Sequence, residues 1–134
     1  MRLVDLYETD DGRELLYQLL KERDDTINIS HQKMPTMEEH LRFVESRPYQ
    51  YWYLIIANDL YVGAVYLSKN NEIGVGILKK NHRKGYGKAA VLALMAAHPG
   101  RKFLANINPR NLASGFMFRE LGFSILQVTF SKEG

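Results

Sequence analysis

The residues best suited to chemistry lie in one stretch, Lys79-Lys-Asn-His-Arg-Lys-Gly-Tyr-Gly-Lys88. An apolar run from Ile73 to Leu78 precedes it and predicts a strand, and apolar residues at helical spacing follow it and predict a helix that opens at Lys88. Gly85 and Gly87 let a ligand approach the backbone closely. The free N–H groups of a first helical turn and the positive end of the helix dipole attract anions. The sequence therefore predicts a phosphate site at this turn.

The distribution of charge along the chain independently supports an anionic ligand. No Asp or Glu occurs from Ile73 to Arg119, whereas that segment contains nine Lys and Arg residues. Lys and Arg number 8 against 13 Asp and Glu in residues 1–72, and 10 against 2 in residues 73–134. We therefore expect a polyanion at the second half of the chain and a cationic or amine group near the first half.

Other glycine motifs can be compared with the same residues. Gly85-Tyr-Gly-Lys-Ala-Ala90 fits the dinucleotide-binding pattern, but that pattern needs an acidic residue about 20 positions later, and none occurs before Glu120. A P-loop is excluded because Ala89 stands where a Ser or Thr must bind Mg²⁺. Two alternatives stay open: a glycine turn that binds nothing, and a nucleic-acid-binding module that uses the basic half.

Length and composition limit the remaining possibilities. The 134 residues suffice for one domain with its own core, residues 1–134. The chain has no Cys, and its four His residues lack the spacing of a helical metal site, so we predict no metal. No apolar run approaches ~18 residues and no signal-peptide pattern is present, so we expect a cytoplasmic protein with no membrane partner.

Patterns in the first half predict a strand and two helices. Arg2 to Tyr7 alternates as a short strand, and Asp10 or Asp11 could cap a helix that continues to Leu20. Residues 23–35 read as a loop that could form a substrate rim and carries His31. Thr36-Met-Glu-Glu39 is a capping box, so a second helix should begin there and end before Pro48.

Patterns after Pro48 predict the rest of the sheet. Residues 49–56 and 60–67 form an expected antiparallel hairpin, and the strand from Ile73 extends it into a three-stranded meander. Further expected elements are a strand at 103–107, a helix at 113–121 that Asn111 caps and Gly122 ends, and a strand at 124–130 that closes the sheet. This order predicts an α/β (α+β) fold with helices on both faces of a twisted, mixed, mostly antiparallel sheet.

The order of elements and two motifs resemble the GNAT superfamily of acyl-coenzyme A-dependent N-acetyltransferases. The first motif, His82-Arg-Lys-Gly-Tyr-Gly87, is similar to the family's pyrophosphate-binding pattern, in which an Arg or Gln usually stands at the place of His82. The second, from Asn108 to Phe123, is similar to the family's Asn-initiated helix that ends in Leu-Gly-Phe. The resemblance covers essentially the whole chain and implies acetyl-CoA as co-substrate.

The resemblance also implies where acetyl-CoA would bind. Gly74 and Gly76 suggest a bulge in the strand, which would free the N–H groups of Ile77 and Leu78 to hold an oxyanion. Backbone groups of Ile77 and Lys79 would pair with the pantetheine arm, and the amides from Lys84 to Lys88 would take the diphosphate. The predicted cofactor-binding residues are Ile77, Leu78, Lys79, His82, Arg83, Lys84, Gly85, Tyr86, Gly87, Lys88, Asn106, Asn111 and Phe116.

The predicted catalytic residues are Glu72, Leu78 and Tyr66. Glu72 reads as the general base for the acceptor amine, directly or through a water, or as a mere strand-edge charge. Phe118 stands where many family members carry a Tyr thought to protonate the leaving thiolate, so another Tyr or a water must replace it. His31 and Tyr66 are the candidate substrate contacts.

The expected partner is a primary amine of a small molecule, such as an amino sugar or another amine. We expect neither a nucleic acid nor a membrane as partner, and a monomer or homodimer. Two alternative functions remain, a nucleic-acid-binding module and a coenzyme A-binding protein without catalysis.

Overall fold

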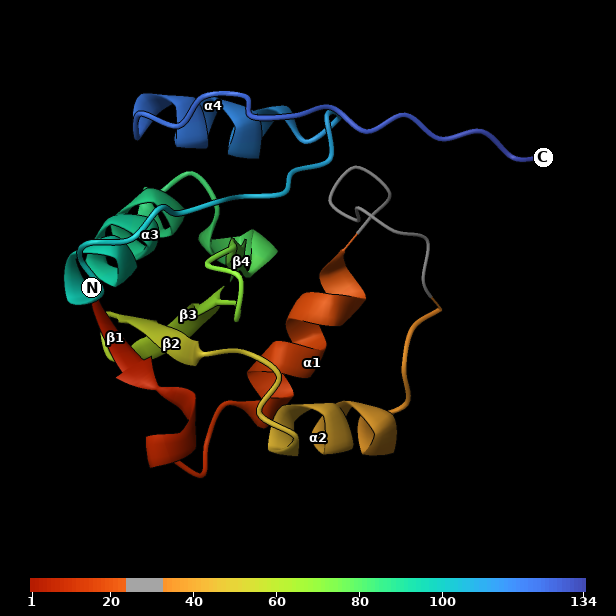
Figure 1. Cartoon of the computed structure of the whole chain (residues 1–134). Coiled ribbons are helices and arrows are strands. Elements are labelled where there is room, and N and C mark those ends of the chain that lie inside the picture. Colours follow the sequence, from red (N-terminus) through yellow and green to blue (C-terminus); the bar gives the residue numbers. More distant parts are fainter. Residues whose placement is uncertain (24–32) are drawn as a thin grey trace.

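Four antiparallel strands form the sheet in a computed structural model that describes residues 1–23 and 33–134 (Figure 1). Neighbours in the sheet are also neighbours along the chain, in the order β1 (Arg2–Asp5), β2 (Tyr51–Ala57), β3 (Leu60–Leu67) and β4 (Ile73–Ile77). The predicted meander is therefore confirmed as β2, β3 and β4. Asn58 and Asp59 connect β2 to β3, and both have a positive φ, as a tight two-residue hairpin turn requires.

In the described part of the chain, four α-helices cover the two faces of the sheet. α1 (Arg13–Glu22) and α2 (Met37–Glu45) lie on one face, and α3 (Tyr86–Ala97) and α4 (Leu112–Glu120) lie on the other (Figure 1). Short 3-10 turns occupy Leu6–Glu8 and Lys79–Asn81. The predicted fold class, with helices on both faces of an antiparallel sheet, is confirmed. None of the described helices is long and apolar enough to cross a membrane.

Each face of the sheet has its own apolar core, because successive side chains of a strand point to opposite faces. On the α3 side, Ile55 and Leu67 pack with Val91 and Leu94 of the helix. On the α1 side, the core contains Leu6, Leu16, Val44, Trp52, Leu54 and Ala64. The two cores hold α1 and α3 on opposite faces of the same strands, and the ends of both helices reach β4.

Capping signals in the sequence correctly predicted the start of α2 and both ends of α4. The capping box is confirmed, since Glu39 N–H donates to the Thr36 hydroxyl and Thr36 N–H donates to the Glu39 carboxylate. Asn111 caps α4 as predicted, and at its other end Gly122 N–H donates to Arg119 C=O and Phe123 N–H to Phe118 C=O, a Schellman motif.

Two predicted helix starts were wrong. α1 has Gly12, in the left-handed region, as its N-cap in place of Asp10 or Asp11. Residue 12 is restricted to glycine, because a Cβ there would collide with Leu54. α3 begins at Tyr86, two residues before the predicted start, since Gly85 also takes a left-handed conformation and serves as N-cap.

Two predicted strands are absent. Residues 103–107 form only an isolated parallel bridge between Leu104 and Glu72, because the chain then diverges from β4 around a cleft. Residues 124–130 carry an apolar, strand-like pattern but lie beside no strand, and the segment extends away from the sheet (Figure 1). Its side chains Ile125, Leu126, Val128 and Phe130 are exposed.

The predicted bulge in β4 is also absent. β4 pairs with β3 in an unbroken register from Gly63↔Ile77 to Leu67↔Ile73. The register shift lies instead between β2 and β3, where Val62 is skipped between the pairs Ile55↔Gly63 and Ile56↔Tyr61. The glycines of β4 therefore have another cause. A side chain at Gly74 would collide with the ring of Tyr66. Gly76 pairs with Ala64, and the close approach beside it constrains Gly63 of β3, whose Cβ would collide with the Gly76 carbonyl oxygen.

The contact between Gly63 and β4 gives a test of the packing. Gly63→Ala should destabilise the protein by about 1–3 kcal/mol, as overpacking of an ordered core does, because backbone atoms must move to admit the methyl group. Gly115→Ala is the control. Its Cβ would meet nothing within 4 Å, and Ala in place of Gly inside a helix should stabilise by about 0.5–1 kcal/mol. Chemical denaturation of both variants measures the difference; equal stabilities would contradict the close approach of β3 and β4.

Candidate functional site

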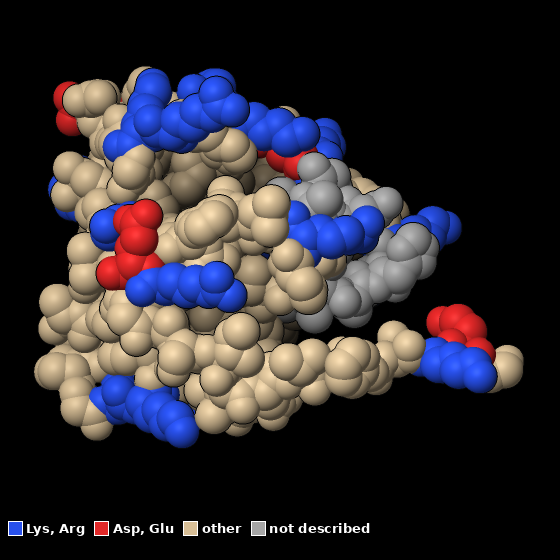
Figure 2. Space-filling view, turned by 90° about the horizontal axis from the view of Figure 1, so that it is seen from above, with Lys and Arg blue, Asp and Glu red and all other residues tan. Residues whose placement is uncertain are grey.

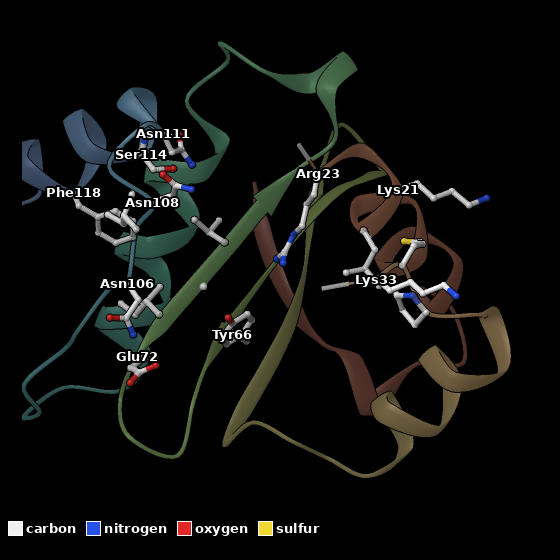
Figure 3. Close-up of a pocket in the computed structure, with 17 residues that line it drawn as sticks. Lys21, Arg23, Lys33, Tyr66, Glu72, Asn106, Asn108, Asn111, Ser114 and Phe118 are labelled. Carbon is white, nitrogen blue, oxygen red and sulfur yellow. Dashed lines mark hydrogen bonds between the residues drawn. The ribbon is translucent and has the colours of Figure 1, made fainter. Parts of the chain in front are cut away.

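A cleft of about 580 Å³ opens where the chain after Leu104 leaves β4 (Figure 3). One wall is β4, and the opposite wall is the segment that leads into α4. A third side is formed by the end of α1 and the residues before α2. The lining residues from these segments include Glu72, Gly74, Val75, Asn106, Asn108, Asn111, Ser114 and Phe118, with Leu20, Lys21, Arg23, Lys33, Met34 and Pro35 from the α1–α2 side and Tyr66 from β3.

The cleft-facing edge of β4 offers backbone donors and acceptors. Leu78 N–H donates to Val62 C=O at 2.9 Å and so faces β3, whereas Ile73 N–H donates to Leu104 C=O at 2.7 Å and faces the other way. Because these directions alternate along an antiparallel strand, the backbone groups of Val75 and Ile77 also point away from β3. The expectation that Leu78 N–H is free was therefore wrong, and Val75 and Ile77 provide the edge instead.

The turn that leads into α3 has the shape of an anion site. Arg83 and Gly85 both have a positive φ, of 63° and 79°, and alternation of such residues with right-handed ones turns successive N–H groups inward. The first intrahelical bond is from Ala89 N–H to Gly85 C=O, and no side chain caps the helix. The N–H groups of Tyr86, Gly87 and Lys88 belong to the first turn, which has no helical acceptors for them.

Side chains around this turn are only partly available to a ligand. Lys88 forms an ion pair with Glu120 of α4 at 2.9 Å, so its ammonium is drawn to α4. The His82 ring donates from Nε2 to Ile77 C=O at 2.8 Å, which ties the turn to the end of β4. Lys and Arg nevertheless predominate over acidic residues on this side of the molecule (Figure 2). The geometry fits a phosphate group bound by backbone amides and surrounded by positive charge.

Glu22 makes a contact that no sequence signal indicated. Its carboxylate accepts the N–H of Lys79 at 2.8 Å, which joins the last turn of α1 to the end of β4. Burial by itself would raise the pKa of Glu22, but the hydrogen bonds from Lys79 and Gln18 outweigh it and lower the pKa. The Lys79 amide, expected to contact the cofactor, is thus occupied by Glu22.

Tyr66 reaches the cleft because β4 has no side chain at Gly74. The Tyr66 ring lies over that glycine and stacks on Tyr49, with ring centroids 3.8 Å apart and planes at 4°. Trp52 contacts both rings edge-on. Burial raises the pKa of the Tyr49 hydroxyl, with a further contribution from Tyr66. Tyr49 and Trp52 therefore act as packing that fixes Tyr66, which keeps its own hydroxyl in the lined cleft.

The other predicted site residues fall into three groups. Glu72, Asn106 and Asn111 line the cleft, and Phe118 lies there too, buried to 5% exposure, without a hydroxyl. Asn111 also caps α4, so its carbonyl oxygen is already engaged with Ser114 N–H. Phe116 is 63% exposed on α4 and does not line the cleft, so its predicted contact has no support in this arrangement. His31 lies outside the described residues.

Within residues 1–23 and 33–134, no group of three His, Asp or Glu residues is placed to hold a metal ion. The described lining of the cleft consists of backbone groups, amides, one carboxylate and three cations, and the α3 turn presents backbone amides. Such a site can bind an extended anionic ligand along β4 and hold a second molecule near Glu72 and Tyr66.

Comparison with known proteins gives the fold a name. The sequence matches no protein-family model, and no curated protein matches it. Solved structures do match. A domain from Methanocaldococcus jannaschii is 24% identical over 92% of this chain and 87% of its own, with a TM-score of 0.74. Ribosomal-protein-alanine N-acetyltransferase from Brucella melitensis is 18% identical over 92% and 85%, also with a TM-score of 0.74.

A third match carries a ligand. The structure of yncA from Salmonella typhimurium, solved with its cofactor acetyl-CoA, is 18% identical over 98% of this chain and 86% of its own, with a TM-score of 0.69. The chain therefore has the fold of the GNAT N-acetyltransferases, and the resemblance predicted from its motifs is confirmed for the fold.

The position of Tyr66 can be tested with two glycines of one strand. Gly74→Ala should displace the Tyr66 ring from the cleft, because the new methyl group would occupy the place of the ring. Gly76→Ala is the control, since its Cβ would only touch Leu19 at 3.6 Å, an ordinary contact. Aromatic NMR resonances of Tyr66, shifted by the stacked Tyr49 ring, should move in the first variant and stay in the second. An unchanged Tyr66 in Gly74→Ala would show that the ring does not depend on this glycine.

Proposed function

We propose that the protein is an acyl-CoA-dependent N-acetyltransferase that transfers acetyl from acetyl-CoA to the primary amine of a small molecule. The observation that carries this proposal is the combination of an amide-lined turn at the start of α3 with a cleft along the open edge of β4. These two features adjoin, because the turn follows β4 directly in the chain. The likeness to N-acetyltransferases in fold supports the same reaction class.

The residues of the turn would bind the diphosphate of the co-substrate. The first-turn amides of Tyr86, Gly87 and Lys88 suit its oxygens, and the positive end of the α3 dipole adds to the attraction. Along the cleft, the outward N–H and C=O groups of Val75 and Ile77 suit an amide-containing arm, which can pair with a strand edge as another strand would. The Ile77 carbonyl already accepts a hydrogen bond from His82. The N–H of Ile77 is therefore the better candidate for pairing with the arm.

Acetyl-CoA supplies a thioester, in which the acceptor nitrogen forms a bond to the acetyl carbon while the carbon–sulfur bond breaks. Glu72 would remove the proton that the ammonium form of the acceptor must lose, since an alkylammonium has a pKa of about 10 and is not nucleophilic at neutral pH. An outward N–H of β4, at Val75 or Ile77, would stabilise the negative charge on the carbonyl oxygen.

The leaving thiolate must also be protonated. Phe118 lines the cleft but has no hydroxyl, so it cannot do so. Tyr66, on β3, lines the same cleft and carries a hydroxyl. We therefore assign the protonation of the thiolate to Tyr66. Tyr66 of β3 would thus protonate the thiolate, as a Tyr at the position of Phe118 in α4 is thought to do in many members of the family.

Coenzyme A binding can be tested at Gly87. A Cβ at this position would point toward Met117 and Ile77 at 3.5 and 3.7 Å, which the fold tolerates. The branched side chain of Gly87→Val should cover the first-turn amides and weaken coenzyme A binding by about tenfold or more, the loss of at least one charge-assisted hydrogen bond. Calorimetry with coenzyme A measures the affinity, and Gly115→Val, at an open position of α4, is the control. An unchanged affinity in a folded Gly87→Val would contradict the phosphate turn.

The role of Glu72 is tested by Glu72→Gln. This change keeps the shape of the side chain and removes the base, so kcat should fall on the order of 10²-fold while acetyl-CoA affinity barely changes. The acidic limb of the pH–rate profile should move or vanish, because the group that it reports is gone. Glu38→Gln, on the exposed side of α2, is the control. Turnover near the wild-type rate would mean that the proton leaves by another route. Coenzyme A binding without turnover of any amine in the wild-type protein would reduce the function to binding alone.

A further inference from the structure

The α1–α2 side of the cleft is positively charged, although the first half of the chain is acidic overall. Lys21, Arg23 and Lys33 all line this side. Glu72, which directly precedes β4, is the only acidic residue among the described residues that line the cleft. Among the described residues, this side therefore contributes three cations and no carboxylate to the lining of the cleft.

Arg23 is the cation that points into the cleft. It follows α1 directly as its C-cap, and Figure 3 shows its side chain reaching toward β4 and Tyr66, whereas Lys21 and Lys33 point away from that strand. Burial is the main cause of the raised pKa of Tyr49, the ring that stacks on Tyr66. Arg23 lies close enough to Tyr49 for the charge of Arg23 to oppose this rise. Lys21 is held elsewhere, 5.0 Å over the ring of Tyr17.

The two ion pairs among the described residues, Arg13–Glu45 and Lys88–Glu120, do not involve Arg23. A guanidinium presents a planar fork of donors that matches carboxylate and phosphate oxygens, and it stays charged at any physiological pH. Its position in the cleft therefore suits an anionic group of a ligand. A bare ammonium at the same place would be repelled, because like charges at short range disfavour each other.

We infer that the acceptor is an amine that also carries an anionic group, a carboxylate or a phosphate. Arg23 binds the anion, and Glu72 receives the amine end. This inference rests on the proposed acetyltransferase function and narrows its substrate class. It disfavours polyamines and other polycationic acceptors, which would place further positive charge beside Arg23, Lys21 and Lys33.

The places of the two charges also indicate how far apart the two ends of the acceptor are. Tyr66 lies over Gly74, two residues along β4 from Glu72, and Arg23 reaches toward the Tyr66 side of the cleft (Figure 3). Two residues of a strand span about 7 Å. The amine and the anion should therefore be separated by several bonds, as in an ω-amino acid, rather than share one carbon as in an α-amino acid.

The experiment compares acceptors that differ only at the end remote from the amine. Alkylamines, ω-amino carboxylates, ω-aminoalkyl phosphates and α,ω-diamines of equal chain length are assayed with acetyl-CoA by release of coenzyme A thiol. A remote carboxylate hardly alters the pKa of the amine, so differences report binding in the cleft. We expect kcat/KM for the anionic acceptors to exceed that for the alkylamines on the order of 10- to 100-fold, the range for hydrogen bonds to charged groups. The diamines should be the poorest acceptors, and the carboxylate and phosphate series show which anion is preferred.

Variants assign the preference to Arg23. Arg23→Gln should remove most of the preference for anionic acceptors, chiefly through a higher KM for these acceptors. The kcat/KM of the alkylamines should stay unchanged or improve. Arg23→Lys, which keeps the charge but loses the fork, should recover part of the preference. Arg42→Gln removes an exposed Arg of α2 that does not line the cleft, and it should retain the full preference. The preference should also shrink at high salt, since Arg23 is exposed and its charge is screened.

The outcomes separate this inference from the proposed function. Acetylation of alkylamines or diamines as fast as of their anionic counterparts would overturn the inference and leave the acetyltransferase proposal standing. The same holds for a preference that Arg23→Gln and Arg42→Gln preserve equally. An absence of thiol release with all four acceptor series would overturn the inference, and an absence of thiol release with any amine would overturn the acetyltransferase proposal as well.

Discussion

The cleft and the residues around it depend on one structural feature: no described strand pairs along the outer edge of β4. Ile73 N–H bonds to Leu104 C=O, and beyond that single bridge the two chains separate. An exposed strand edge is normally a liability, because its free N–H and C=O groups invite pairing with other chains. Here the edge faces a cleft, where the same groups at Val75 and Ile77 can serve a ligand instead. A continuous strand at 103–107 would satisfy the edge and close the site.

The two cores then determine what surrounds that edge. α3 packs on one face through Val91 and Leu94, which fixes its N-terminus, and hence the anion turn, at the end of β4. α1 packs on the other face through Leu16, which brings the C-terminal end of α1 to the same strand, where Glu22 accepts the Lys79 amide. The proposed cofactor turn and the proposed acceptor side would thus meet at β4, because helices on opposite faces of one sheet are both anchored to it.

Local signals predicted much of this, and tertiary contacts decided the rest. The capping box at Thr36, the Asn111 cap and the hairpin at 58–59 depend on residues near in sequence, so they could be predicted. The glycine turn before α3 was predicted for the same reason, and phosphate binding there stays a prediction. The role of Gly74 could not be, because it depends on Tyr66 from the neighbouring strand, and a glycine in a strand indicates either a bulge or a close approach. Apolar alternation at 124–130 indicates a strand only where a neighbour can pair with it, and the sequence does not specify that neighbour.

The net charge of a segment also fails to specify which charges surround a site. The excess of Asp and Glu in residues 1–72 led to the expectation of a cationic or amine group near that half. The fold places most of the described carboxylates elsewhere, and among the described residues that line the cleft it leaves Lys21, Arg23 and Lys33 with Glu72 as the only carboxylate. A ligand in a half-enclosed cleft responds to the few charges within a Debye length, about 8–10 Å at physiological salt, and not to the net charge of a segment. Under the proposed function, Glu72 would match the amine of the acceptor, while Arg23 in the cleft would favour an anion. This placement of Arg23 comes from the three-dimensional structure and not from the net charge of the segment.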